Sequence, residues 1–330
     1  MNDPSPARRR LLACSGLVLA CCFGDVRAAE RVPVVGFLNS ATPELYQFNV
    51  QAFRDGLRSE GFVEGKNVTI EYRFARGDYG RLPALAGELV AMQVAAIAAT
   101  GDVPSARAAQ SATKSIPVVF TIGGDPVKFG LVSSYNQPGG NITGISLITS
   151  QMGSKRIELL HELVPQAVIG MFMNPDNSNA RVELADAVGT AQRFGHRTVV
   201  VNARNAGEFD AAFATLVQQG ANALFVGTDP MILSQRERLV AFATRQRIPA
   251  IFWVREFAEI GGMLSYGASI RFMYHEAGVY IGRILKGAQP ATIPVLQPTK
   301  VEMIVNRRSA RNLGIEIPNG LLLRADDIID

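Results

Sequence analysis

The sequence predicts an α/β protein built as two doubly wound parallel-sheet domains. The chain has 330 residues, which is more than one ordinary domain needs, and 48% of them are hydrophobic against 19% charged. Short apolar stretches alternate with longer stretches of helical spacing, a pattern typical of parallel strands joined by helical crossovers. The alternation begins again near residue 168, so two similar domains are expected.

The first 28 residues are predicted to be a cleaved signal peptide. Arg8, Arg9 and Arg10 form a basic start, Leu11–Phe23 is apolar, and Val26-Arg27-Ala28 offers small residues at a cleavage site. The apolar run is too short for a spanning helix, which needs about 20 residues. Cleavage is expected after Ala28, with Ala29 as the second choice.

Two variants of export stay open. Arg9-Arg10 fits a twin-arginine signal, and Cys21 fits a lipid-anchored cysteine, although Leu19 matches the lipoprotein pattern poorly. All three cysteines, Cys14, Cys21 and Cys22, fall within the signal, so the mature chain offers no disulfide and no thiolate. Removing residues 1–28 leaves 29 basic against 27 acidic residues, a net charge of +2, and no nucleic-acid partner is expected.

The strands and helices of the first domain are predicted from where the apolar residues change between strand-like alternation and helical spacing. Strands are expected at 34–38, 68–74, 94–99, 117–121 and 142–147. The second of these alternates cleanly, with Val68, Ile70, Tyr72 and Phe74 on one face. Helices are expected from Leu45 to about Leu57, before Gly61, and at 106–113.

The second domain repeats the scheme. Strands are expected at 168–173, 197–201, 223–226 and 249–254, and helices at 154–164, 180–194, 209–218 and 232–245. Ligands of open parallel sheets bind outside the carboxyl ends of the strands, so the residues after each strand are candidate contacts. These segments are 39–42, 100–102, 123–125, 174–178, 227–229 and 255–256.

Small, hydroxylated and carboxylate residues dominate these segments. They expose backbone N–H groups that favour anions, and Asp125 and Asp229 could meet an ammonium group. A helix N-cap explains each residue equally well when it is taken alone. The repetition in both halves favours two polar rims facing each other across a cleft. Tyr46, Phe129, Trp253 and Tyr266 lie near the same strand ends, where they could line the cleft or pack in the core.

No catalytic residue, metal site or cofactor is predicted. The three histidines, His161, His196 and His275, lie in no metal-binding spacing and are interpreted as structural or solvent-facing. The sequence has no G-x-S-x-G elbow, no phosphate-binding loop and no G-x-G-x-x-G motif. An exported enzyme on the same fold stays the alternative.

Several ordered motifs resemble the ABC transporter substrate-binding protein family, including its tryptophan-type members. They include Ile116–Phe120, Pro138–Gly144, Lys155–Leu160, Gly261–Gly267 and Pro294–Lys300, and the resemblance covers residues 31–330. It implies the type I periplasmic binding fold with a three-segment hinge. The first lobe would comprise 31–145 plus 267–290, and the second 146–266 plus 291–330.

The resemblance also implies a function. A monomeric periplasmic protein would capture a small ligand, an amino acid or a similar small carboxylate, and pass it to a membrane permease with a separate ATPase. A ligand-sensing role is a further alternative. The positions that could contact the ligand are Ser40, Thr100, Gly101, Gly124 and Asp125, opposed by Asn174, Asp229 and Tyr266.

Overall fold

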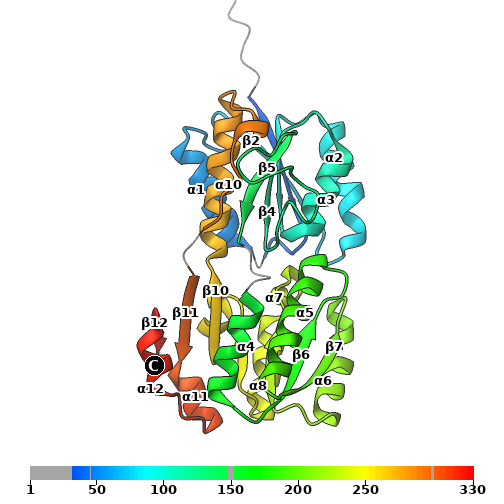
Figure 1. Ribbon diagram of the computed structural model, residues 1–330. Helices are drawn as coiled ribbons and strands as arrows, with labels where there is room; N and C mark the ends of the chain where they lie inside the picture. The colour runs from blue at the N-terminus through cyan, green and yellow to red at the C-terminus, as the bar shows by residue number, and fades with distance from the viewer. Residues whose placement is uncertain (1–31, 45, 148–151, 299–300) are drawn as a thin grey trace, which may run out of the picture. The chain divides into compact units, whose positions relative to one another are not determined.

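The computed structural model describes residues 32–44, 46–147, 152–298 and 301–330. The predicted signal peptide, with its cysteines, lies outside the described residues and stays a prediction. Residues from Val32 to Asp330 form one compact unit, which contains two β-sheets, each with helices on both faces (Figure 1). This architecture confirms the predicted α/β fold with two sheets.

The first sheet is wholly parallel and has the strand order β2-β1-β3-β4-β5 within the described residues. Its strands are β1 (Val34–Asn39), β2 (Thr69–Phe74), β3 (Ala96–Thr100), β4 (Val118–Ile122) and β5 (Ile142–Ser146). Helices α1 (Gln47–Ser59) and α10 (Ile270–Leu285) cover one face, and α2 (Leu82–Ala91) and α3 (Asp102–Ala112) cover the other (Figure 1). Along β1, Phe37 packs against Phe53 of α1, whereas Leu38 belongs to the apolar cluster of α2 and α3.

Helix α10 covers one face of the first sheet together with α1, although it comes from much later in the chain. It lies against α1 so closely that a Cβ on Gly56 would sit 1.9 Å from the His275 carbonyl oxygen. A Cβ on Gly278 would sit 2.1 Å from the Phe53 carbonyl oxygen. Only glycine at these two positions permits this separation of the helices.

Contacts with the first sheet continue beyond α10 and the short helix η4 (Pro290–Thr292). The backbone N–H of Val295 donates to the Tyr135 carbonyl over 2.7 Å, and Leu296 bridges Ile145. The Val295 side chain joins the apolar cluster of α2 and α3. The first-sheet part therefore reaches Leu296, beyond the predicted crossing at 290, because this segment buries an apolar side chain there. The other lobe boundaries stay a prediction.

The second sheet has the order β12-β11-β10-β9-β8-β6-β7 within the described residues. Its strands are β6 (Val168–Met173), β7 (Arg197–Asn202), β8 (Ala223–Val226), β9 (Ala250–Phe252), β10 (Leu264–Ala268), β11 (Val301–Asn306) and β12 (Asp327–Ile329). Side chains of β6 alternate: Met171 belongs to the cluster beneath α4 (Met152–Leu163) and α5 (Ser178–Arg193), and Phe172 packs on Phe209 of α6 (Phe209–Gln218).

Three features differ from the sequence prediction. The helix expected at 232–245 is two helices, α7 (Pro230–Ser234) and α8 (Arg236–Gln246), because Gln235 between them leaves the helical conformation with φ −112° and ψ 23°. Helices α2 and α10 and strands β10, β11 and β12 are among the elements that were not predicted. Strand β11 pairs antiparallel to β10, since the chain re-enters the sheet there from the first-sheet side.

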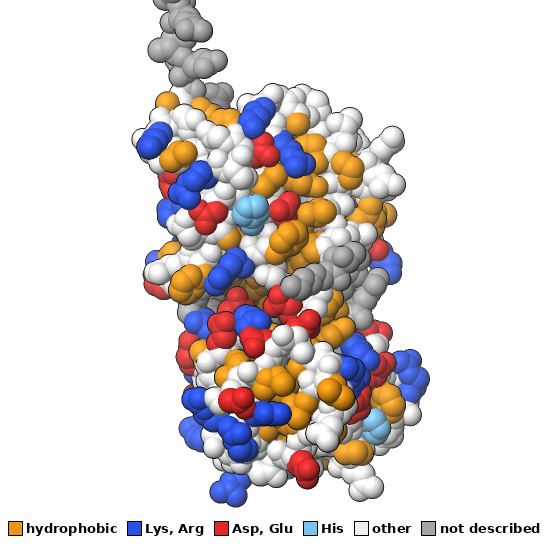
Figure 2. Space-filling view, turned by 90° about the vertical axis from the view of Figure 1, so that its left-hand side faces the viewer, with side chains coloured by type: hydrophobic (Ala, Val, Ile, Leu, Met, Phe, Trp, Pro, Cys, Tyr) orange, Lys and Arg blue, Asp and Glu red, His pale blue; other side chains and the backbone are white. Residues whose placement is uncertain are grey.

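The chain ends with short elements on the outer edge of the second sheet. Helix α9 (Arg255–Glu259) precedes β10, and α11 (Arg307–Leu313) and α12 (Asn319–Arg324) flank β12. Figure 2 shows acidic and basic side chains intermingled on this side of the molecule. Arg255 pairs there with both Asp327, at 2.8 Å, and Glu302, at 3.5 Å. In the described part of the chain, no helix is long and apolar enough to cross a membrane.

The close approach of α1 and α10 generates a stability prediction. Gly278→Ala forces the helices apart or strains their backbones, so we expect a loss of about 1–3 kcal/mol in the free energy of unfolding by urea. Gly87→Ala is the matched control, because Gly87 is an exposed position of α2 with open space around its Cβ. That control should gain up to about 1 kcal/mol from helix propensity. Equal effects of the two substitutions would contradict this account of the packing.

Candidate functional site

A tight backbone turn places the Asp102 carboxylate at the carboxyl end of β3. Gly101 and Asp102 both have left-handed backbones, with φ 89° and 73°. A Cβ on Gly101 would lie 2.5 Å from Ser40 Oγ, and that hydroxyl donates to the Gly101 carbonyl over 2.7 Å. Glycine is therefore required at 101, and the turn directs the buried Asp102 side chain toward the N–H of Gly123, 2.9 Å from Oδ1.

A second buried carboxylate, Asp229, follows β8 of the other sheet. Its Oδ1 accepts from the Ile232 N–H over 2.9 Å, which caps helix α7. Its Oδ2 accepts three side-chain donors: the Tyr79 hydroxyl at 2.5 Å, Asn177 Nδ2 at 3.0 Å and Asn174 Nδ2 at 3.2 Å. Tyr79 lies in the short helix η1 (Tyr79–Arg81) after β2, so one of these bonds joins residues of the two sheets.

Asn177 connects the two carboxylates. Its Oδ1 accepts from the Asn179 N–H over 3.0 Å and caps α5, which turns the amide NH₂ toward the carboxylates. Nδ2 donates to Asp102 Oδ2 over 2.9 Å and to Asp229 Oδ2 over 3.0 Å. The four residues Tyr79, Asp102, Asn177 and Asp229 thus form one hydrogen-bonded chain, here called the polar bridge, which crosses twice between residues of the two sheets.

Burial sets the electrostatics of the polar bridge. It raises the pKa of Asp229 to about 6 despite the hydrogen bonds from Tyr79 and Asn177, which act in the opposite direction. Burial likewise raises the pKa of the Asp102 carboxyl. The pKa of the Tyr79 hydroxyl is well above its ordinary value, because of burial first and the Asp229 charge second. Tyr79 is therefore the donor in its short bond to Asp229.

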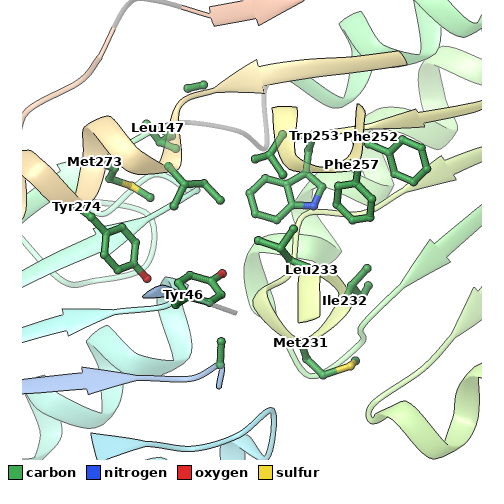
Figure 3. Packing of buried hydrophobic residues seen from close by; sticks show 14 of the residues in the cluster. Tyr46, Leu147, Met231, Ile232, Leu233, Phe252, Trp253, Phe257, Met273 and Tyr274 are labelled. Carbon is green, nitrogen blue, oxygen red and sulfur yellow. The ribbon is translucent and has the colours of Figure 1, made fainter. Parts of the chain in front are cut away.

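A cavity of about 30 Å³ lies beside the polar bridge. Figure 3 shows Tyr46, Leu147, Met273 and Tyr274 on one side of it and Trp253 on the other. The remaining lining residues are Gly101, Asp102, Thr121, Ile122, Gly123, Thr228, Pro230 and Ile270. The fully buried Thr121 hydroxyl has no hydrogen-bond partner within the described residues. The cavity thus combines one carboxylate, an available hydroxyl and an aromatic and apolar wall.

A buried ion pair supports the loop that carries Asp229. Arg156 and Glu183 are fully buried and in contact, and Arg156 Nη1 donates to the Val226 carbonyl over 2.9 Å. Glu183 accepts from both the backbone N–H and the hydroxyl of Thr228, at 2.7 and 3.0 Å. Burial lowers the pKa of Arg156 to about 9, so the guanidinium is charged at neutral pH beside its carboxylate. Residues 226–228 are therefore held rigidly just before Asp229.

The structure brings together five of the eight predicted site residues. Gly101 lines the cavity, and Asp229 and Asn174 belong to or contact the polar bridge. Ser40 and Thr100 lie behind the cavity wall, where the Thr100 hydroxyl accepts from Asn39 Nδ2 over 2.8 Å. Both support the turn at Gly101 and do not line the cavity.

The other three predicted residues do not line the cavity. Asp125 Oδ1 accepts from the Val127 N–H over 2.9 Å and stabilises a turn, and a Cβ on Gly124 would meet the Phe129 ring. Tyr266 lies opposite Met303 in the β10–β11 pair, packed on the second sheet. Of the predicted cleft aromatics, Tyr46 and Trp253 line the cavity.

Sequence reasoning did not select Asp102, Tyr79 or Asn177. Asp102 and Asn177 did stand in the segments after predicted strands, but nothing distinguished them from helix caps. Tyr79, Met273 and Tyr274 come from elements that were not predicted, so no signal marked them. His161 Nδ1 and His196 Nε2 lie 2.9 Å apart, away from the cavity, and the described residues hold no cluster of three metal-binding side chains.

Comparison with known proteins gives the class of the molecule. The family model for "ABC transporter substrate binding protein" matches residues 34–329, so the chain belongs to that family, a family of solute-binding proteins. The two-sheet fold is that of type I periplasmic binding proteins.

The chain is similar to three proteins of known ligand or structure. A tyrosine-binding protein of Clostridioides difficile (strain R20291) is 28% identical over 81% of this chain and 76% of its own. An ABC domain of Streptococcus pneumoniae in complex with L-Trp is 24% identical, with a TM-score of 0.81 over 90% of this chain and 99% of its own. The ligand-free, open structure of a substrate binding protein with adhesive properties from Clostridium difficile is 26% identical, with a TM-score of 0.61 over 90% and 99%.

The raised pKa of Asp229 generates a prediction for stability. Because its folded pKa of about 6 exceeds the ordinary 3.8, this group contributes stability that is full at low pH and lost as the pH rises through 6. The loss amounts to roughly 3 kcal/mol. Asp229→Asn keeps a cap but cannot ionise, so the variant's free energy of unfolding, relative to wild type, should rise by about 2.5 kcal/mol between pH 4 and pH 7, because part of the total loss already occurs below pH 4.

Urea unfolding of both proteins at the two pH values measures this difference, whatever fixed cost the substitution carries. Asp125→Asn is the control, because Asp125 is only partly buried on a turn. A relative stability of Asp229→Asn that stays constant with pH would show that Asp229 titrates alike in both states.

Proposed function

We propose that this protein is the extracytoplasmic component of an ABC importer and that it captures an amino acid with an aromatic side chain. The observation that carries the proposal is the cavity, where the Asp102 carboxylate faces a wall of aromatic and apolar side chains. The captured ligand passes to a membrane permease, and a separate ATPase drives transport. The predicted signal peptide at 1–28 accounts for export to the periplasm.

The chemistry of the cavity matches each part of such a ligand. Asp102 would accept charge-assisted hydrogen bonds from the ammonium group. The unpartnered Thr121 hydroxyl would donate to the carboxylate. Tyr46, Trp253 and Tyr274 would pack against the side-chain ring, where aromatic contacts add to the free energy of burial. The relatives that bind tyrosine and L-Trp support the same ligand class.

Ligand entry requires the two lobes to separate. The cavity of about 30 Å³ is far smaller than the roughly 300–1,000 Å³ of typical ligand pockets. Relatives of similar identity and coverage match this chain with a TM-score of 0.81 in the L-Trp complex but 0.61 in the open structure. This difference supports closure by rotation about the segments that join the lobes, with ligand shifting the equilibrium toward the closed form.

Isothermal titration calorimetry of protein lacking residues 1–28 tests the proposal. We expect L-tyrosine or L-tryptophan to bind, and tyramine and 3-(4-hydroxyphenyl)propionate, which each lack one charged group, to bind much more weakly. Asp102→Asn should weaken binding about 10- to 100-fold, because a charged hydrogen-bond acceptor is lost. Asp125→Asn, on its separate turn, should bind as wild type does, and circular dichroism of both variants checks their folding.

Other results would redirect the assignment. Equal weakening by the two substitutions would contradict the role of Asp102. A ligand recovered chemically changed would indicate an exported enzyme. Binding without any loss of amino-acid uptake in cells that lack the gene would indicate a sensor.

A further inference from the structure

The polar bridge joins two acidic side chains, one beside each sheet. Asp102 starts α3 beside the first sheet, and Asp229 follows β8 of the second sheet. Both are buried, and one amide group, that of Asn177, donates to both. Bringing these carboxylates together while both are ionised is unfavourable, because burial penalises each charge and the two repel each other.

No basic side chain among the described residues lines the cavity to offset this charge. The titratable groups nearest the cavity are tyrosines and carboxylates. Burial raises the pKa of Tyr46 and Tyr274 above the ordinary value, and it also raises the pKa of Glu256 of α9, which Arg236 and Arg271 face. The Arg156 guanidinium, which donates to the Thr228 hydroxyl, is paired with Glu183. The closed arrangement of the bridge is therefore short of one positive charge.

A second, independent feature points to a ligand at this place. The Thr121 hydroxyl is fully buried, lines the same cavity as Asp102 and makes no hydrogen bond within the described residues. Buried hydroxyls normally make a hydrogen bond. In the described part of the chain, the cavity therefore offers a carboxylate with no cation beside it and a hydroxyl with which a ligand can form a hydrogen bond.

We propose that the polar bridge is a cation-dependent latch, in which the ligand's ammonium group beside Asp102 offsets the paired carboxylates so that Asn177 and Tyr79 hold the two lobes together. This rests on the proposed capture of an amino acid. The positive charge of the ligand, rather than its aromatic ring, then drives closure, since only the closed form brings the two carboxylates together. Tyr79 and Asn177 act as positioning residues, because each donates across the gap between residues of the two sheets.

The role of charge is tested by small-angle X-ray scattering of protein lacking residues 1–28. At pH 7.5, L-tyrosine should reduce the radius of gyration, and 3-(4-hydroxyphenyl)propionate, which lacks the amine, should leave it unchanged even at saturation. Without ligand, lowering the pH to 5 should also reduce it, because a proton on Asp229 replaces the missing charge. A radius that is insensitive to pH, or equal compaction by the two ligands, overturns the proposal.

The role of Tyr79 is tested by the rate at which L-tyrosine dissociates. Trp253 lines the cavity and is the single tryptophan of the chain, so its fluorescence reports release in a stopped-flow instrument. Tyr79→Phe removes only the hydroxyl that reaches Asp229, and it should speed dissociation about tenfold or more and abolish compaction at pH 5. Tyr266→Phe, a hydroxyl removed from outside the cavity, should change neither.

The two proposals fail in different ways. If L-tyrosine does not bind to wild type, the proposed capture of this amino acid is wrong. The compaction at pH 5, and its loss in Tyr79→Phe, still test the proposed latch. If L-tyrosine binds and Tyr79→Phe dissociates at the wild-type rate, the latch fails and the binding function stands. Thermal unfolding of both variants separates these effects from a general loss of stability.

Discussion

One amide group connects the polar edges of the two sheets. The Asn177 oxygen is committed to the start of α5, so its two hydrogens are free to reach Asp102 and Asp229. Neither carboxylate could be placed so deeply without such a donor between them, and an aspartate at 177 would add a third negative charge instead. Asn177 thus links the two buried carboxylates beside the cavity, and together with the Tyr79 hydroxyl on Asp229 it joins residues of the first sheet to residues of the second.

The rest of the fold holds the hydrogen-bond partners of Asn177 in position. Parallel strands deliver their carboxyl ends to one edge of each sheet, so the segments after β2, β3, β6 and β8 converge. On the second sheet, the ion pair of Arg156 and Glu183 immobilises the residues before Asp229. On the first sheet, the glycine at 101 lets the chain reverse within hydrogen-bonding distance of Ser40. The ion pair and the turn at Gly101 thus hold the chain in place on both sides of the polar bridge.

Periodicity was enough to predict the two-sheet architecture, because alternating and helical spacing report directly on which faces are buried. Burial pattern cannot distinguish a capping side chain from a ligand contact, and Asp229 is both a cap and a member of the polar bridge. Asp125 fits the same pattern, yet it only stabilises a turn. Tyr79 and Tyr274 meet residues far away in sequence, Asp229 and Asn39 respectively, and such pairings become visible only once the chain is folded.

The interleaved path of the chain has a consequence for biogenesis. One face of the first sheet is covered only when α10 has been synthesised, because Gly278 of this helix packs against Phe53. The second sheet is complete only with β11 and β12 near the C-terminus. Neither half can close its core until nearly all of the polypeptide has been synthesised, and the long loops involved slow folding. Such late completion of the cores keeps the apolar strands exposed during synthesis, when unpaired strands are prone to aggregate.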